Sequence, residues 1–145
     1  MLRLSSFVLL LGAMFSAVSG AIAQCVAIPG TGCPGAPPIF CLGAPQLGQL
    51  AQVSYAVPGE LVIASLGLDG PPWVLPQPLA CAAGCVLAGQ PVLYAFGVGA
   101  AQLLFLVPNN PIYLGFSLIG QGFYIPQAGG GCFMASNALR GTIIL

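Results

Sequence analysis

Two acidic side chains, Glu60 and Asp69, are the only carboxylate side chains that the sequence offers for acid–base chemistry. Two carboxylates on either side of a glycosidic bond can hydrolyse it, one as the acid and the other as base or nucleophile. Glu60 follows Pro58-Gly59 and Asp69 precedes Gly70, so we expect both in turns at strand ends. Acidic side chains in turns are normally solvated, and this context favours two surface charges over a catalytic pair.

The sequence contains no His and no Lys. It therefore lacks the residues for a Ser/His/Asp or Cys/His nucleophile, for the usual His metal ligands and for a lysine nucleophile. Two carboxylates are also too few for a dedicated calcium site. The glycine runs at residues 30–32 and 129–131 lack the Lys and helix of a phosphate loop and are interpreted as turns. We expect no catalytic activity, no cofactor and no metal.

Six cysteines form the other set of reactive residues: Cys25, Cys33, Cys41, Cys81, Cys85 and Cys132. An even number of cysteines in an exported chain without His predicts up to three disulfides. The Cys81-Ala-Ala-Gly-Cys85 spacing could also serve zinc, but zinc sites commonly recruit His. Sequence does not fix the connectivity. Local closure favours Cys33 with Cys41 and Cys81 with Cys85, which leaves Cys25 for Cys132.

Trp73 is the single Trp and has Pro71, Pro72 and Pro76 close by in the sequence. These residues could form an exposed aromatic platform for a sugar ring or a Pro-rich peptide. The favoured interpretation is that Trp73 plugs one end of a β-sandwich, because large aromatic side chains bury much apolar surface.

Arg140 is the one cation outside the first residues of the chain. Strand alternation places it on the face of Ala138 and Thr142, opposite Leu139 and Ile143. We expect an exposed charge that discourages edge-to-edge pairing of a terminal strand. An ion pair with Asp69 or Glu60 is the alternative.

The composition excludes several classes of partner. Hydrophobic residues make up 58% of the chain and charged residues 3%, against about 25% charged in an average globular protein. Nucleic acids and anionic lipid headgroups require several Lys or Arg contacts, which this chain cannot provide. A net charge near zero also removes the repulsion that keeps monomers apart, so we expect association with other proteins or with copies of itself.

Residues 1–23 have the three parts of a secretory signal peptide: Arg3 near the start, an apolar stretch over residues 7–18, and Ala21-Ile22-Ala23 before Gln24. A retained membrane anchor is the alternative, but the apolar stretch is shorter than the ~20 residues needed to span a bilayer. Lipoprotein processing at Cys25 is disfavoured because Gln24 occupies the place of a small residue. The predicted location is secreted, periplasmic or in the cell envelope.

Fourteen Pro and 21 Gly interrupt every candidate helix and leave short apolar runs. Residues 49–57 alternate as a half-buried strand that ends at Pro58-Gly59, and residues 61–68 are apolar on both faces, as in a central strand. Further strands are predicted over residues 91–96, 101–107, 114–125 and 136–145. Residues 71–89 are interpreted as a long loop with a short strand near Val86, and residues 108–111 as a turn opening into one helical turn.

These strands predict one all-β domain over residues 24–145, an antiparallel β-sandwich or small barrel stabilised by disulfides. A transmembrane alternative is residues 86–107, an uncharged stretch long enough to cross a bilayer. Its glycines and Pro91 argue against a spanning helix.

Four sequence elements carry a resemblance to a known group of proteins. They are Gly30-Thr31-Gly32-Cys33-Pro34-Gly35, Gly43-Ala44-Pro45-Gln46-Leu47-Gly48, Val107-Pro108-Asn109-Asn110-Pro111 and Ala135-Ser136-Asn137-Ala138-Leu139-Arg140-Gly141-Thr142-Ile143. In this order they resemble a family of uncharacterised exported β-domains of planctomycete-type bacteria, often found at the C-terminus of longer secreted proteins. The resemblance implies a sandwich-like domain and export, and implies no activity. This sequence departs from the pattern by holding one module and by Cys25 and Cys132.

The sequence therefore favours a secreted or cell-envelope structural or protein-interaction domain without catalytic activity. A carbohydrate-binding or adhesion module that uses Trp73 and the Tyr residues is the alternative.

Overall fold

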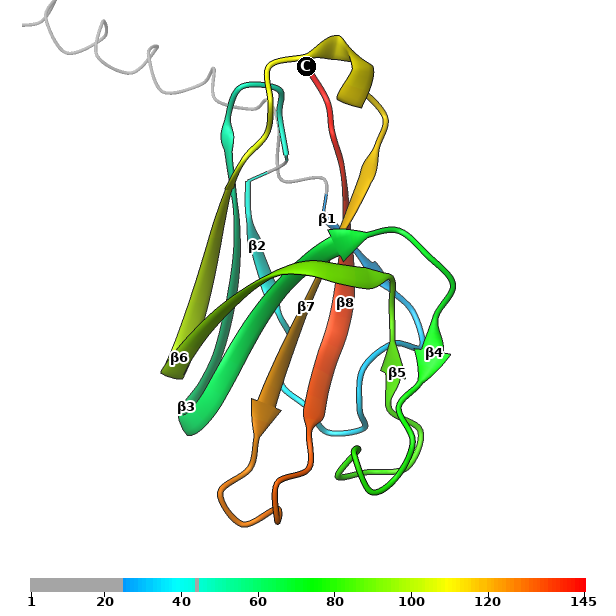
Figure 1. The fold of residues 1–145 in the computed structure, drawn as a ribbon, viewed down its shortest axis with the longest axis vertical. Coiled ribbons are helices and arrows are strands. Elements are labelled where there is room, and N and C mark those ends of the chain that lie inside the picture. The colour runs from blue at the N-terminus through cyan, green and yellow to red at the C-terminus, as the bar shows by residue number, and fades with distance from the viewer. Residues whose placement is uncertain (1–24, 44) are drawn as a thin grey trace, which may run out of the picture.

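The computed structural model describes residues 25–43 and 45–145, so the predicted signal peptide over residues 1–23 lies outside the described residues. The described chain forms strands joined by turns and one 3-10 turn, which confirms the all-β class (Figure 1). The elements are β1 (Cys25–Ile28), β2 (Phe40–Leu42), β3 (Leu50–Leu68), β4 (Trp73–Val74), β5 (Val86–Leu87), β6 (Gln90–Leu106), η1 (Pro111–Tyr113), β7 (Ser117–Ile125) and β8 (Met134–Thr142).

One curled antiparallel sheet contains six of these strands, and β4 pairs separately with β5. The path through the large sheet is β1-β8-β7-β3-β2, with β6 paired to β3 along most of its length. Both β3 and β6 bend where their register shifts, between Ala56 and Leu61, and each strand continues on the other side of the bend (Figure 1). The first half of β3 pairs with β2, and its second half pairs with β7. The bend thus divides one sheet into two layers.

The main core lies between these two layers. Val53 and Tyr55 from the first half of β3 pack with Val62, Ala64 and Leu66 from its second half, together with Ile39, Ala101 and Leu103. The Tyr55 ring sits directly on Gly122 of β7, where a Cβ would lie 2.2 Å from the ring. Only a residue without a side chain leaves room for the ring at this position. The second half of β3 is buried because β6 and β7 flank it and the other layer covers it.

The Tyr55 hydroxyl is fully buried and has no hydrogen-bond partner among the described residues. Burial, and to a lesser extent the neighbouring Tyr124, raises the pKa of Tyr55 well above its ordinary value. The core therefore holds this phenol in its neutral form.

Two predicted strand boundaries are wrong. The strand expected over residues 49–57 does not end at Pro58-Gly59, because Gly59 adopts a φ of 81° and forms a bulge through which β3 continues to Leu68. The strands expected over residues 91–96 and 101–107 are likewise one strand, β6, with Gly97-Val98-Gly99 at its own bend. Irregularities on two paired strands coincide, so both strands turn together.

The other predicted elements agree with the structure more closely. β7 and β8 lie within residues 114–125 and near residues 136–145, β5 includes Val86, and η1 follows the turn at residues 108–111. β1, β2 and β4 were missed because each is only two to four residues long. In the described part of the chain, no helix is long and apolar enough to cross a membrane. The predicted alternative span over residues 86–107 is occupied by β5 and β6.

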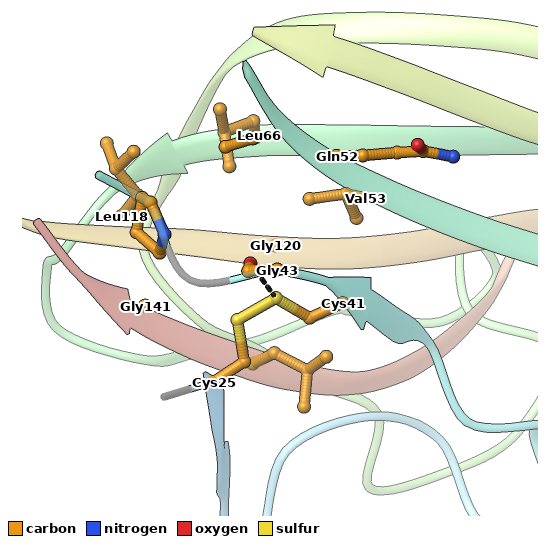
Figure 2. A pocket seen from close by; sticks show the side chains of 12 residues that line it. Cys25, Cys41, Gly43, Gln52, Val53, Leu66, Leu118, Gly120 and Gly141 are labelled. Carbon is orange, nitrogen blue, oxygen red and sulfur yellow. Dashed lines mark hydrogen bonds between the residues drawn. A yellow bond between two sulfur atoms is a disulfide. The ribbon is translucent and has the colours of Figure 1, made fainter. Parts of the chain in front are cut away.

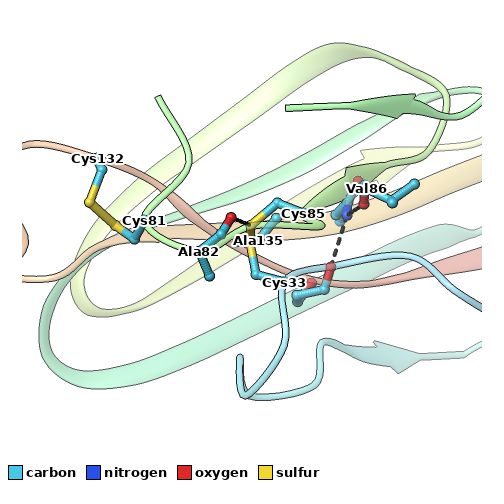
Figure 3. The surroundings of a disulfide bond; sticks show 9 residues. Cys33, Cys81, Ala82, Cys85, Val86, Cys132 and Ala135 are labelled. Atoms are coloured by element: carbon cyan, nitrogen blue, oxygen red, sulfur yellow. Dashed lines mark hydrogen bonds between the residues drawn. A yellow bond between two sulfur atoms is a disulfide. The ribbon is translucent and has the colours of Figure 1, made fainter. Parts of the chain in front are cut away.

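The six cysteines form three disulfides, as expected, but all three predicted pairings are wrong. The bonds are Cys25–Cys41, Cys33–Cys85 and Cys81–Cys132, of which Figure 3 shows the last two. Cys33–Cys85 and Cys81–Cys132 each lie beside a β-bridge between distant segments, and Cys25–Cys41 forms where the curled sheet brings its two ends together, whereas the prediction relied on nearness in the sequence. Because β1 and β2 are the two ends of the sheet path, Cys25–Cys41 links these ends to each other.

Candidate functional site

The two carboxylates lie at different places along β3. Glu60 Oε2 accepts a hydrogen bond of 2.8 Å from the backbone N–H of Gln127, in the turn between β7 and β8. The Gln127 side-chain amide in turn donates to the carbonyl of Gly59. The turn expected at Glu60 is wrong, because Glu60 lies inside β3 at its bend. Asp69 follows the C-terminal end of the strand, and nine residues of extended chain span about 30 Å. The pair cannot flank one glycosidic bond, and Glu60 braces the bend of β3.

Arg140 forms an ion pair with Asp69, with 3.1 Å between Nη2 and Oδ1. Both side chains are about half exposed, so the pair contributes at most about 1 kcal/mol to stability. The expectation that Arg140 protects a sheet edge is wrong, because β8 lies between β1 and β7. The alternative, an ion pair with Asp69, is the one the structure contains.

Cysteine-based metal binding is contradicted by the bonding of the thiols. Cys81 and Cys85, the spacing that could have served zinc, belong to two different disulfides. Within residues 25–43 and 45–145, no group of three or more His, Cys, Asp or Glu residues is placed to hold a metal ion.

A groove of about 340 Å³ lies between the β4–β5 hairpin and the large sheet. Its floor comes from three adjacent strands, since Ile63 of β3 is paired with Phe96 of β6 on one side and with Phe123 of β7 on the other. Residues paired across antiparallel strands point to the same face. Tyr94 lies two residues from Phe96 on that face, and the two rings stack with centroids 6.5 Å apart.

The wall of the groove is the hairpin, in which Trp73 of β4 pairs with Leu87 of β5. Trp73 is 47% exposed, so it does not plug the sandwich as expected. It faces the groove together with Leu75, Pro91 and Phe133. None of the nine lining residues carries a charge, and their only polar side-chain atoms are Trp73 Nε1 and Tyr94 Oη.

A buried glutamine fixes the hairpin to the sheet. Gln121 of β7 is only 2% exposed, and its Oε1 accepts a 3.0 Å hydrogen bond from the backbone N–H of Ala88. Its Nε2 donates to the carbonyls of Val86 and Ser136 at 3.3 and 2.8 Å. One side chain therefore connects the hairpin with β7 and β8 and leaves no side-chain donor unpaired.

The disulfide Cys33–Cys85 also fixes the hairpin. It joins the residue just before β5 to the segment between β1 and β2 (Figure 3). Gly32 and Val86 exchange two backbone hydrogen bonds of 2.7 and 3.0 Å next to it. Cys81–Cys132 ties the loop between β4 and β5 to the segment before β8. The wall of the groove is thus fixed by covalent and hydrogen bonds before any ligand is present.

A much smaller cavity lies beside the Cys25–Cys41 disulfide. Figure 2 shows it between this disulfide, Val53, Leu66 and Leu118, and its volume of about 30 Å³ leaves room for about one water molecule. It is too small for a ligand and marks where the two ends of the sheet meet.

Strand β6 forms an open edge of the sheet. It is 17 residues long, contains no charged residue, and among the described strands pairs only with β3. Seven of its large apolar side chains are 42 to 81% exposed: Val92, Leu93, Tyr94, Phe96, Val98, Leu104 and Leu106. Natural edge strands usually carry charges that prevent pairing with other chains, and β6 lacks them.

Sequence reasoning identified Trp73 but missed the aromatic side chains of β6 and β7 that share its groove. The spacing of Tyr94 and Phe96, two residues apart in a predicted strand, was a usable signal that both face one side. Comparison of the chain with protein-family models, with curated proteins and with solved structures found no match.

Proposed function

We propose that this chain is a structural interaction domain without catalytic activity, working outside the cytoplasm, and that it binds a second copy of itself through β6. The observation that carries the proposal is the charge-free open edge of β6. Three disulfides support the compartment, because such bonds persist in oxidising surroundings. The resemblance to exported β-domains points to the same location.

A second copy suits this edge chemically. An unpaired strand presents a row of backbone N–H and C=O groups that another strand can satisfy. Two copies of β6 bring no like charges together, since the strand has none. β6 is also the longest edge strand of the described sheet, because β1 and β2, at the two ends of the sheet path, have only four and three residues.

Exposed apolar side chains lie along the edge of β6. Outside the groove they are Val92, Leu93, Val98, Leu104 and Leu106, which lie on both faces of the strand. Exposed apolar surface beyond scattered single residues commonly marks an interaction site on a monomer.

The test is the oligomeric state of the purified, oxidised chain, measured by analytical ultracentrifugation over a range of concentrations. Val98 and Leu104 are exposed on β6 and lie outside the groove. Replacing both with Lys places positive charges on the edge and is expected to weaken dimerisation at least tenfold. Ile112→Lys is the control, because Ile112 is equally exposed but lies in η1.

A wild-type chain that stays monomeric at the highest attainable concentration would rule out self-association. Equal weakening by Ile112→Lys and by the β6 substitutions would show that the association does not involve this edge. Circular dichroism of each variant establishes that the fold is retained.

The second candidate function is carbohydrate binding, favoured by the half-exposed ring of Trp73 beside that of Tyr94. Sugar sites combine a stacking ring with several polar groups, and this lining has only two polar side-chain atoms. Binding on a glycan array that disappears in Trp73→Ala and persists in Trp73→Phe would support this alternative. Absence of binding by the wild-type chain would exclude it for the sugars tested.

A further inference from the structure

We infer that the aromatic groove is a binding site for a small uncharged ligand that carries an apolar ring system. The groove is separate from the pairing edge that the proposed function uses, because it opens on the face of the sheet under the β4–β5 hairpin. The inference therefore goes beyond self-association and does not depend on it.

The dimensions of the groove fit a small molecule. Its volume of about 340 Å³ falls in the lower part of the range of ~300 to ~1,000 Å³ found for small-molecule sites. The hairpin that carries Trp73 and Leu87 forms a wall beside the floor of Ile63, Phe96 and Phe123. The β4–β5 hairpin would keep the flat β-sheet of another protein away from this floor, whereas a small ring system fits between the hairpin and the floor.

The lining determines the chemistry of the ligand. Five of the nine lining residues are aromatic, and three of these rings, Trp73, Tyr94 and Phe96, are 47, 51 and 68% exposed. Stacked and edge-on contacts with these rings favour another ring. A charged ligand would lose hydration without gaining an ion pair, because no lining residue carries a charge.

The groove is formed before the ligand arrives. Gln121 makes three hydrogen bonds between the hairpin and the sheet, and Cys33–Cys85 anchors the strand that carries Leu87. Ligand binding therefore does not have to order the wall, a cost that often lowers affinity.

The experiment uses N-phenyl-1-naphthylamine as the uncharged probe and 1-anilinonaphthalene-8-sulfonate, which has the same rings and a sulfonate, as the charged counterpart. Trp73 is the only Trp of the chain, so its fluorescence reports on the groove. We expect the uncharged probe to bind with one site per chain, to quench Trp73 and to shield it from acrylamide. The charged counterpart is expected to bind at least tenfold more weakly.

Phe96→Ala removes a ring from the floor while keeping the Trp73 reporter, and is expected to weaken probe binding about tenfold. Leu104→Ala is the matched control, because Leu104 is similarly exposed on the same strand but lies outside the groove. It should change the affinity less than twofold. Measurements on the Val98→Lys, Leu104→Lys variant, kept dilute, separate this result from any loss of dimerisation.

Several outcomes would overturn the inference. They are binding at many weak sites, equal affinity for the two probes, equal effects of Phe96→Ala and Leu104→Ala, or bound probe that leaves Trp73 unshielded. A wild-type chain that is monomeric yet binds the probe as described would contradict the proposed function and leave this inference standing.

Discussion

The end of the molecule around the β4–β5 hairpin and the two-layered body of the sheet are stabilised differently. The hairpin end has a small core that includes Cys33 and Cys85, and two of the three disulfides lie there. The core of the body contains no cysteine and is built from packed side chains of β3 and β6 with Ile39. Short strands with little apolar surface need covalent links, whereas long bent strands bury enough surface to pack without them.

The largest expected effect is at the hairpin end. Replacing Cys33 and Cys85 together with Ala opens a link of sequence separation 52, and should lower the free energy of unfolding by about 4 kcal/mol. The same change at Cys25 and Cys41, with a separation of 16, should cost about 3 kcal/mol. Urea unfolding measures both. A greater cost for the second pair would mean that closing the sheet matters more than loop length.

The next effect tests packing in the body. Leu103 and Leu104 are neighbours on β6, but the first is 5% exposed and the second 62%. Leu103→Ala should destabilise the chain by about 3 kcal/mol, and Leu104→Ala by less than ~0.5 kcal/mol. Equal losses in chemical unfolding would refute the assignment of the two faces of β6.

The smallest expected effect is at the hydroxyl of Tyr55. Removing a buried hydroxyl that lacks a partner, by Tyr55→Phe, should stabilise the chain by about 1 kcal/mol. The pKa of Tyr55 is raised in the folded chain, so the unfolded chain loses its proton first as the pH rises past ~10.

From that pH upwards this group should lower the stability of the wild-type chain by about 1.4 kcal/mol per pH unit, because the folded chain keeps a proton that the unfolded chain releases. Tyr55→Phe lacks this contribution. Urea midpoints of both chains between about pH 8 and about pH 11 measure the difference. Parallel curves would show that Tyr55 titrates normally in the fold.

Local patterns predicted much of this fold. The alternation of residues 49–57 and the apolar run of residues 61–68 both lie in β3. Prediction failed where a distant strand decides the outcome. Judged from the local sequence alone, Gly59 predicts the end of a strand. In the structure it lies opposite the bend of β6 and forms a bulge, and β3 continues beyond it.

The candidate groove shows the same limit. Alternation could place Tyr94 and Phe96 on one face, but only the pairing of β3 with β6 and β7 brings Ile63 between Phe96 and Phe123. The disulfides depend on strand pairing too, since Cys33 and Cys85 meet beside the exchange of backbone bonds between Gly32 and Val86. Nearness in the sequence contains none of this information.

The bond between Cys25 and Cys41 bears on how far the proposed self-association through β6 would proceed. It joins the two outermost strands of the sheet path, which leaves β6 as the long strand available for pairing in the described part of the chain. Two molecules that each have one long unpaired strand edge form a two-fold symmetric dimer in which both edges are paired. A fibre requires a second interface on each molecule, so we expect association through β6 to stop at the dimer.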